Sequence, residues 1–396
     1  METFLVALRL GLTSFGGPIA HLGYFRAEYV VRRRWLDDAT YAEIVALCQS
    51  LPGPTSSEVG IAIGLLRAGP AGAFLAWLGF TLPSAVLLVA FALFVDQLGD
   101  QAAGWVRGLS IVAVAVVALA VWSMARVLAW DPLRGSLAIA AAVAALVFPG
   151  FLTQIAIIAA AGALGWALLR SPTLASPISA PVPISRRVAF ACAALFLGLL
   201  IVLPLARFTT ASGEIALFDS FYRAGALVFG GGHVVLPLLH AEVVPPGWVT
   251  EERFLAGYGA AQAVPGPLFT FAAYIGAATA PSPPVGDMFA TWPPNGPLGA
   301  VLALIAIFLP AFLLVFAALP LWGALRDRAD AQAALRGINA AVVGILLAAL
   351  ISPVASSAIR GPVDAALALA ALAMLVGKLP PWFVVITIAA IASVLR

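Results

Sequence analysis

Long apolar segments recur along the whole chain and are separated by short polar stretches. Most are close to the length of about 20 residues that crosses a hydrocarbon core as a helix. Leu and Ala run continuously through them, whereas a membrane-spanning strand would alternate apolar and polar residues. The pattern therefore predicts an all-α polytopic membrane protein with about 13 hydrophobic segments. We assign them to residues 3–25, 40–66, 70–96, 105–129, 133–149, 151–169, 188–206, 217–240, 253–278, 298–323, 334–352, 362–377 and 381–395.

The motifs of the chain occur twice, in the same order and at nearly constant spacing. Arg9–Pro18 (RLGLTSFGGP) corresponds to Arg223–Gly232 (RAGALVFGGG). Gln49–Pro54 (QSLPGP) corresponds to Gln262–Pro267 (QAVPGP). We therefore predict a first transporter repeat, a linker with one extra helix, and a second repeat, at residues 1–169, 170–207 and 208–396. If each repeat crosses the membrane an even number of times, the extra helix inverts the second repeat, a common plan of secondary transporters.

The first two segments of each repeat are interrupted near their middle by Gly and Pro. The interruptions are Gly16-Gly17-Pro18, Pro52-Gly53-Pro54, Gly230-Gly231-Gly232 and Pro265-Gly266-Pro267. Proline removes a backbone donor and clashes with the preceding helical turn, and glycine frees the backbone. Two interpretations stay open, namely four kinked spans or four re-entrant hairpins that enter and leave the membrane on one side.

The distribution of basic residues favours the hairpins. With thirteen simple spans and a cytoplasmic N-terminus, 11 basic residues fall inside and 8 outside, and the arginine-rich loop 26–38 lies outside. With re-entrant first and second segments, 14 of the 21 fall inside and 5 outside, while Arg9 and Arg223 stay in the membrane. The second count agrees with the positive-inside rule. We therefore favour two inverted-topology repeats with nine spans and four re-entrant hairpins.

The composition excludes several classes of protein. Hydrophobic residues make up 63% of the 396 positions, charged residues only 10%, and the mean hydropathy is +1.06. A water-soluble fold could not bury so much apolar surface, and a nucleic-acid-binding role is excluded with it. The chain has no GxxxxGK[ST] loop, HExxH motif, GxSxG elbow or Cys/His cluster. We therefore predict no enzymatic activity, cofactor or metal, and a transport process powered by a gradient or by the substrate itself.

The interruptions have the chemistry of an anion site. A hairpin tip leaves backbone N–H groups unpaired at the start of its second half-helix, and lipid cannot satisfy them. The helix dipole adds partial positive charge there, so such ends bind anions. Inverted repeats would bring tips from both faces to one central point. The predicted binding residues are Thr13, Ser14, Gly16, Gly17, Pro18, Gln49, Pro52, Gly53, Pro54, Thr55, Gly230, Gly231, Gly232, Gln262, Pro265, Gly266 and Pro267.

Two arginines and two titratable residues complete the candidate site. Arg9 and Arg223 carry a planar fork that suits a tetrahedral oxyanion, so we include them among the binding residues. The structural alternative is an arginine that pairs with a carboxylate or reaches the membrane surface. Glu58, after the first Pro-Gly-Pro tip, and His233, after Gly232, are the proton-coupling candidates. For them the alternatives are a carboxylate paired with arginine and a packed, hydrogen-bonded histidine.

These doubled motifs resemble the chromate ion transporter family, whose long members have two homologous halves. The resemblance covers essentially the whole chain. The family's motif corresponds here to Phe15, Gly16, Gly17, Pro18, Gln49, Pro52, Gly53, Pro54, Phe229, Gly230, Gly231, Gln262, Pro265, Gly266 and Pro267. The resemblance implies a carrier in the inner membrane of the cell that exports chromate, confers chromate resistance and is driven by the proton motive force. Because chromate is an isostere of sulfate, a sulfate-related role is implied as well.

The sequence departs from this motif in two places. Gly232 stands where the first repeat has Pro18, and the second tip keeps one main hydroxyl, Thr270, where the first has Thr55–Ser57. The two half-sites are therefore unequal, and the sequence leaves open which one holds the anion. An oxyanion channel, or a carrier for sulfate or chromate uptake or exchange, remains an alternative to export. A homodimer also remains open.

Overall fold

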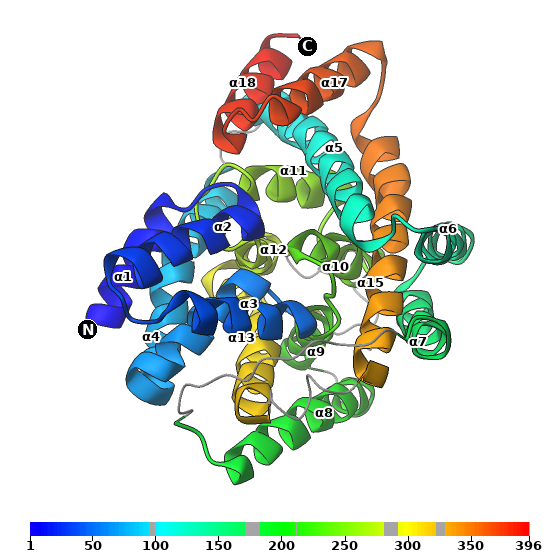
Figure 1. Ribbon diagram of the computed structural model, residues 1–396. Coiled ribbons are helices and arrows are strands. Elements are labelled where there is room, and N and C mark those ends of the chain that lie inside the picture. The colour runs from blue at the N-terminus through cyan, green and yellow to red at the C-terminus, as the bar shows by residue number, and fades with distance from the viewer. Residues whose placement is uncertain (96–99, 171–182, 211, 281–291, 322–328, 396) are drawn as a thin grey trace.

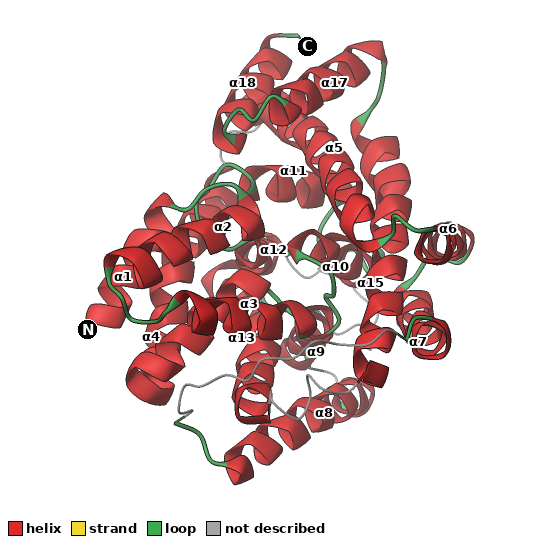
Figure 2. Cartoon of the chain, in the orientation of Figure 1, coloured by secondary structure: helices red, strands yellow, loops and turns green. Residues whose placement is uncertain are grey.

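The chain is built from helices and connecting loops. The structure, a computed structural model, describes residues 1–95, 100–170, 183–210, 212–280, 292–321 and 329–395 (Figure 1). Within these ranges every regular element is a helix and there is no strand (Figure 2). Most of the predicted linker 170–187 lies outside the described residues.

Most helices of the first half begin at a capping, Gly or Pro residue. They are α1 (Glu2–Thr13), α2 (Gly17–Phe25), the π-helix η1 (Arg26–Arg32), α3 (Asp38–Ser50), α4 (Thr55–Phe94), α5 (Asp100–Leu128), α6 (Pro132–Val147) and α7 (Phe151–Leu168). The Asp37 carboxylate caps α3 by accepting a hydrogen bond from the Thr40 backbone N–H at 2.7 Å. The predicted loop 26–38 is wrong in part, because the helix continues as η1 through Arg32.

The second half follows the same order after one additional helix. Its helices are α8 (Arg186–Thr209), α9 (Gly213–Ala226), η3 (Gly232–Val234), α10 (Val235–Val243), α11 (Glu251–Ala261), η4 (Leu268–Thr270), α12 (Phe271–Ala278), α13 (Gly296–Ala318), η5 (Leu319–Leu321), α15 (Ala329–Ala349), η6 (Leu350–Ala355), α16 (Ser356–Ala358), α17 (Pro362–Val376) and α18 (Pro381–Val394). Thr250 caps α11 by accepting a hydrogen bond from the Arg253 N–H at 3.4 Å. This cap stands at the position equivalent to Asp37.

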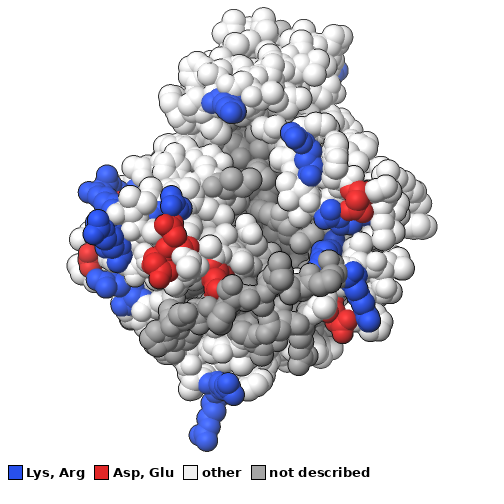
Figure 3. Space-filling model, viewed as in Figure 1, with Lys and Arg blue, Asp and Glu red and all other residues white. Residues whose placement is uncertain are grey.

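Among the described residues, six helical stretches are long and apolar enough to cross a membrane. They are Thr55–Phe94, Ala103–Leu128, Phe151–Leu168, Arg186–Thr209, Gly296–Leu321 and Ala329–Ala358. Shorter apolar helices include α6, α17 and α18. Large apolar side chains such as Phe190, Leu197 and Ile201 of α8 are exposed, and uncharged surface dominates the face in Figure 3. The chain is therefore a multi-pass helical membrane protein.

Helix α4 consists of two parts that meet at a sharp kink. Ala68 and Gly69 leave the helical conformation, Gly69 with φ of +66°, and Pro70 opens the second part. In the second half Gly296 has φ of +60° and precedes Pro297 at the start of α13. Positive φ favours glycine, which explains this residue at both corners. The first part of α4 thus corresponds in order to η4 and α12, and the second part to α13.

Each half packs its first helix on its long apolar helix through a glycine. Helix α1 lies against α4, where a Cβ at Gly11 would come within 2.6 Å of the Phe80 carbonyl oxygen. Helix α9 lies against α13, where a Cβ at Gly225 would overlap the Ile307 carbonyl oxygen. Gly11 and Gly225 occupy equivalent positions of the doubled motif. The missing side chain allows the two backbones to approach closely, as in other membrane helix pairs.

The other long helices pack across the two halves. Helix α5 lies against α17 and α18, and α15 lies against α6 and α7 (Figure 1). Small residues make both contacts close. A Cβ at Gly108 of α5 would come within 2.5 Å of the Ala389 Cα, and one at Gly337 of α15 would come within 2.8 Å of the Gly165 Cα. Each half therefore completes the packing of the other.

Candidate functional site

The first break in each half is made by two consecutive glycines with positive φ. Between α1 and α2, Gly16 and Gly17 have φ of +102° and +77°. Between α9 and η3, Gly230 and Gly231 have φ of +75° and +149°. Because side chains strain this backbone conformation, the doubled glycines explain why both helices stop here and restart in a new direction.

The second break in each half is the Pro-Gly-Pro sequence, and its glycine binds the other half. The Gly53 N–H donates a hydrogen bond to the Val228 carbonyl at 2.7 Å, and the Gly266 N–H donates to the Ser14 carbonyl at 3.0 Å. Ser14 and Val228 both lie two positions before a double glycine, so they hold matching positions in the doubled sequence motif. The two hydrogen bonds are therefore equivalent and reciprocal, and they hold all four breaks around one centre.

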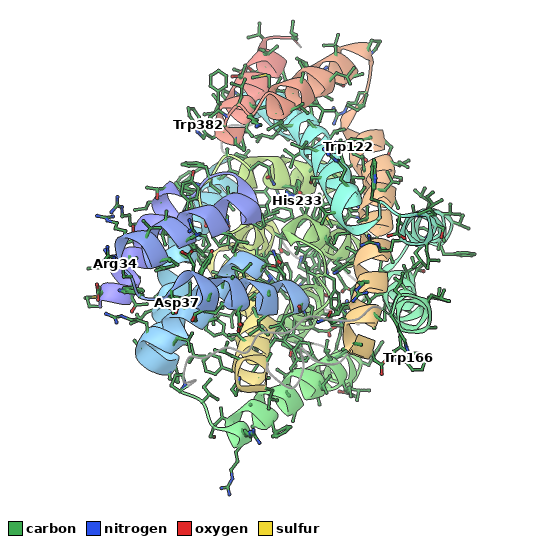
Figure 4. The ribbon with its side chains drawn as sticks, viewed as in Figure 1. Arg34, Asp37, Trp122, Trp166, His233 and Trp382 are labelled. Carbon is green, nitrogen blue, oxygen red and sulfur yellow. The ribbon has the colours of Figure 1, made fainter. Side chains whose placement is uncertain are left out.

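Side chains from both halves also meet at this centre. A Cβ at Gly232 would lie 3.6 Å from Pro18 Cγ, 3.9 Å from Leu268 Cδ2 and 4.0 Å from Phe269 Cε2. A Cβ at Gly266 would lie 2.8 Å from the Ser84 Oγ of α4. Predicted residues from all four interruptions thus come together in the interior, in the same region of the molecule as His233 (Figure 4).

Buried polar groups without partners gather on the first-half side of the centre. The Ser14 and Ser57 hydroxyls, the His21 Nε2 atom and both Glu58 carboxylate oxygens are buried, with no hydrogen-bond partner among the described residues. His21 Nδ1 lies 3.2 Å from Ser56 Oγ. Buried polar atoms are nearly always hydrogen-bonded in proteins, so this cluster has unused capacity to bind a ligand.

The polar groups on the second-half side are already engaged. The Thr270 hydroxyl donates to the Pro267 carbonyl at 2.7 Å, and His233 Nδ1 lies 2.6 Å from the Tyr258 hydroxyl oxygen. Gln262 Nε2 donates to the Tyr258 carbonyl at 3.4 Å. Position 271, which is equivalent to Glu58, is a phenylalanine. The second tip thus has an apolar residue where the first has a carboxylate. The side chains of Thr270, His233 and Gln262 beside it already have partners.

The sequence matches the model of the chromate transporter family in two regions, residues 1–166 and 215–394. The chain belongs to the chromate transporter family. It is 30% identical to the chromate transport protein of Pseudomonas aeruginosa over 91% of this chain and 82% of that protein. It is also similar to the probable chromate transport protein of Synechococcus elongatus (27% identity, 87% of this chain, 82% of that protein) and to the chromate transport protein of Cupriavidus metallidurans (26%, 93% and 86%). No solved structure matches this chain.

The two candidate arginines have different environments. Arg223 contacts the carboxylates of Asp219 at 2.7 Å and Glu242 at 3.0 Å, and its guanidinium lies 4.3 Å from the centre of the Phe151 ring. This is the carboxylate-paired alternative that the sequence left open. Arg9 is exposed on α1, and no ion pair to another described residue is formed.

The polar groups beside the tips also differ in exposure. Thr13, which donates its hydroxyl hydrogen to the Arg9 carbonyl at 2.8 Å, is exposed, and so is Gln49. Thr55 is half-buried at the start of α4. Ser84, whose hydroxyl faces the second tip, was missed by the sequence analysis, and the one available signal was Pro83 directly before it, a proline inside an apolar segment.

In the first half of the chain, the outer ends of the broken helices converge. Glu2 at the start of α1 contacts Arg33 at 2.9 Å and Arg67 at 3.6 Å. The Arg67 guanidinium, next to the kink of α4, lies 5.0 Å from the centre of the Trp35 ring. Glu28 binds Arg33 at 2.7 Å as well. The start of α1, the end of η1 and the kink of α4 are therefore adjacent.

The second half has an equivalent meeting point. The Ala280 N–H, after α12, donates to the Trp248 carbonyl at 2.8 Å, and the Trp292 indole donates to the Ala280 carbonyl at 2.5 Å. The Arg207 guanidinium, at the end of α8, lies 5.6 Å from the Trp248 ring centre. Trp248 is the counterpart of Trp35 in the doubled pattern, so each meeting point contains an arginine stacked on an equivalent tryptophan.

Proposed function

We propose that this protein is a secondary active transporter that exports chromate, or a related tetrahedral oxyanion, across the inner membrane of the cell. Membership of the chromate transporter family supports the solute class. The observation that carries the proposal is the reciprocal pair of hydrogen bonds, Gly53 to Val228 and Gly266 to Ser14, around one interior centre. A solute site between two related halves is a recurrent plan of secondary transporters.

The proposal includes two inverted repeats whose first two segments are re-entrant hairpins. It is supported by the contacts of Glu2 with Arg33 and Arg67, since a segment that crossed the membrane would separate its ends. The matching contacts of Trp248 and Ala280 support the same topology for the second half. The single helix α8 between the halves gives the second one the opposite orientation.

We propose that the oxyanion binds at the tips, mainly on the first-half side. The donors would be free backbone N–H groups at the start of α2 and α4, together with the hydroxyls of Ser14 and Ser57. Helix N-termini carry partial positive charge, and hydrogen bonds from several donors suit the oxygens of a tetrahedral anion. Arg9 remains a candidate that the anion contacts on its path, whereas Arg223 has two carboxylate partners.

Coupling to the proton motive force requires a group that takes up a proton near the anion. Glu58 is the candidate that the geometry favours, because its carboxylate is buried at the first tip and unpaired. His233 is the second candidate, although its Nδ1 atom already has the Tyr258 hydroxyl as a neighbour at 2.6 Å.

Flux measurements on the purified protein in liposomes test the proposal. A carrier will accumulate chromate against its gradient when a proton gradient or a membrane potential is imposed, and sulfate will compete if it shares the site. An oxyanion channel will only dissipate a gradient. Under the same imposed proton gradient or membrane potential, a carrier for uptake will move chromate in the opposite direction. An exchanger will move chromate only when an anion is present on both sides of the membrane. Absence of oxyanion flux under all these conditions contradicts the proposal.

A further inference from the structure

The Glu58 side chain folds back over the first Pro-Gly-Pro tip. A Cβ added at Gly53 would overlap the Glu58 Oε1 atom, so the carboxylate lies directly against the tip. The side chain is 0% exposed, and neither oxygen has a hydrogen-bond partner among the described residues. The carboxyl group therefore lies next to the start of α4, at the end of the helix that attracts negative charge.

Apart from the partial positive charge of the helix end, nothing in the described surroundings of Glu58 balances a negative charge. The neighbouring titratable groups are the buried Cys48 thiol of α3 and His21 of α2, which lies beside Ser56. No lysine or arginine among the described residues forms an ion pair with Glu58. An isolated carboxylate in such a place is very costly, so the group must bind a cation or a proton.

The carboxyl group and a transported anion compete for the same helix end. An oxyanion at the start of α4 would lie beside Glu58, and two negative groups at one site cannot both stay ionised without a large electrostatic cost. We infer that an oxyanion binds only when Glu58 carries a proton, so that each oxyanion moves together with one proton in the same direction. This inference rests on the proposed function and adds to it the sign of the coupling.

The inference has a consequence for energetics. A divalent oxyanion with one proton carries a single net negative charge. A membrane potential that is negative inside therefore drives export, while a pH gradient that is acid outside opposes it. Phe271 stands at the position equivalent to Glu58, so the second tip offers no matching carboxyl group. We therefore expect about one proton for each anion.

The test measures the direction of proton movement with the full-length protein in liposomes that contain a pH-sensitive dye. Sulfate is the first probe, because it carries no proton near neutral pH, and chromate is tested at alkaline pH, where it is fully deprotonated. Entry of either anion should acidify the interior. Glu58→Gln should retain anion flux, lose the acidification, and carry about twice the charge per anion. Glu2→Gln, which changes an exposed carboxylate away from the tips, should behave as the wild type.

Three outcomes contradict the inference while leaving the transport function intact. They are alkalinisation during anion entry, anion flux in the wild type without any pH change, and unchanged acidification in Glu58→Gln. A wild type without oxyanion flux contradicts the proposed function and the inference together. If Glu58→Gln does not fold, proton uptake by the wild-type protein in detergent tests the inference instead. Anion binding in weak buffer should then take up about one proton per anion.

Discussion

The two tips of this protein share a backbone and differ in chemistry. Both have a glycine of positive φ between prolines, and both donate that glycine's N–H to the opposite half. At the first tip the hydroxyl of Ser57 and the carboxylate of Glu58 have no partner, whereas at the second Thr270 is bonded to a carbonyl and position 271 is Phe. The two halves thus share one backbone arrangement at the tips, and the polar groups without partners are concentrated in the first half.

The same contrast holds for the arginines on the preceding helices. Arg9 is exposed, while its equivalent Arg223 takes part in a buried network with Asp219, Glu242 and Arg207. The network holds two positive and two negative side chains, so it is balanced. We conclude that the charged groups of this network in the second half satisfy one another. The first half is the one that has capacity left for a ligand.

The largest expected effect comes from breaking the balanced network. Arg223→Gln leaves buried carboxylates without one of their two cations and should destabilise the protein by about 3–5 kcal/mol. Arg9→Gln, at the equivalent exposed position, should leave stability unchanged. Thermal unfolding of both variants in detergent measures the difference. An Arg223→Gln protein of normal stability but weakened anion affinity would reverse the roles that we assign to the two halves.

The glycines of the two Pro-Gly-Pro tips test whether the Glu58 carboxylate is what makes the first tip differ from the second. Gly53→Ala and Gly266→Ala place a methyl group at φ of +144° and +103°, each costing about 1–2 kcal/mol of backbone strain. Only Gly53→Ala displaces a carboxylate, whereas Gly266→Ala meets the Ser84 hydroxyl. We expect the pH dependence of chromate flux to shift in Gly53→Ala alone. Equal pH profiles in the two variants would show that the carboxylate does not distinguish the tips.

The equivalent hydroxyls of Ser57 and Thr270 allow a more direct comparison of the two tips. Ser57→Ala removes an unpaired hydroxyl and should lower the affinity for oxyanion about tenfold, with little change in stability. Thr270→Ala, at the equivalent position of the second tip, removes the hydrogen bond to Pro267 and should cost about 1 kcal/mol of stability without changing affinity. Concentration dependence of flux and thermal unfolding report the two effects. The opposite pattern would move the anion site to the second half.

The smallest expected effect concerns a feature that contributes only to folding. Thr250→Ala removes the cap of α11 and should cost about 0.5 kcal/mol, the low end for a helix cap, since the Arg253 N–H loses an acceptor that lies 3.4 Å away. Transport at saturating chromate should not change. The unfolding midpoint and the maximal flux, measured on the same preparation, check both statements. A variant with normal stability but reduced flux would connect this cap to the transport cycle.

The sequence predicts the helical, membrane-spanning nature of the chain and the positions of its breaks, because these depend on local chemistry. Apolar runs of sufficient length and clusters of Gly and Pro are visible within a single segment. It also suggests that the tips are unequal, since a run of hydroxyls follows only the first Pro-Gly-Pro. The residues of the break between α3 and α4 illustrate this success, because the chain turns at Gly53, as the motif predicts.

The sequence could not predict which side chains meet across the fold. The pairing of Arg223 with Glu242 joins α9 to α10, and Arg207 of α8 joins the same network. Each contact depends on tertiary packing rather than on local pattern. The i,i+4 spacing of Asp219 and Arg223 was the one available signal for their ion pair. The unfilled polar capacity of Ser14 and His21 likewise emerges only when neighbouring helices are in place.

The crossed packing of the long helices constrains the order in which the protein can be assembled. Gly108 of α5 packs on Ala389 of α18, so a helix made early in synthesis reaches its final neighbour only when the chain is almost complete. Contacts between such distant parts of a chain form late and slow folding. Until then the close-packing face of α5 must be covered by lipid or by another membrane protein. A chain that stops before α18 would leave that face permanently exposed in the bilayer, where quality-control proteases could recognise it.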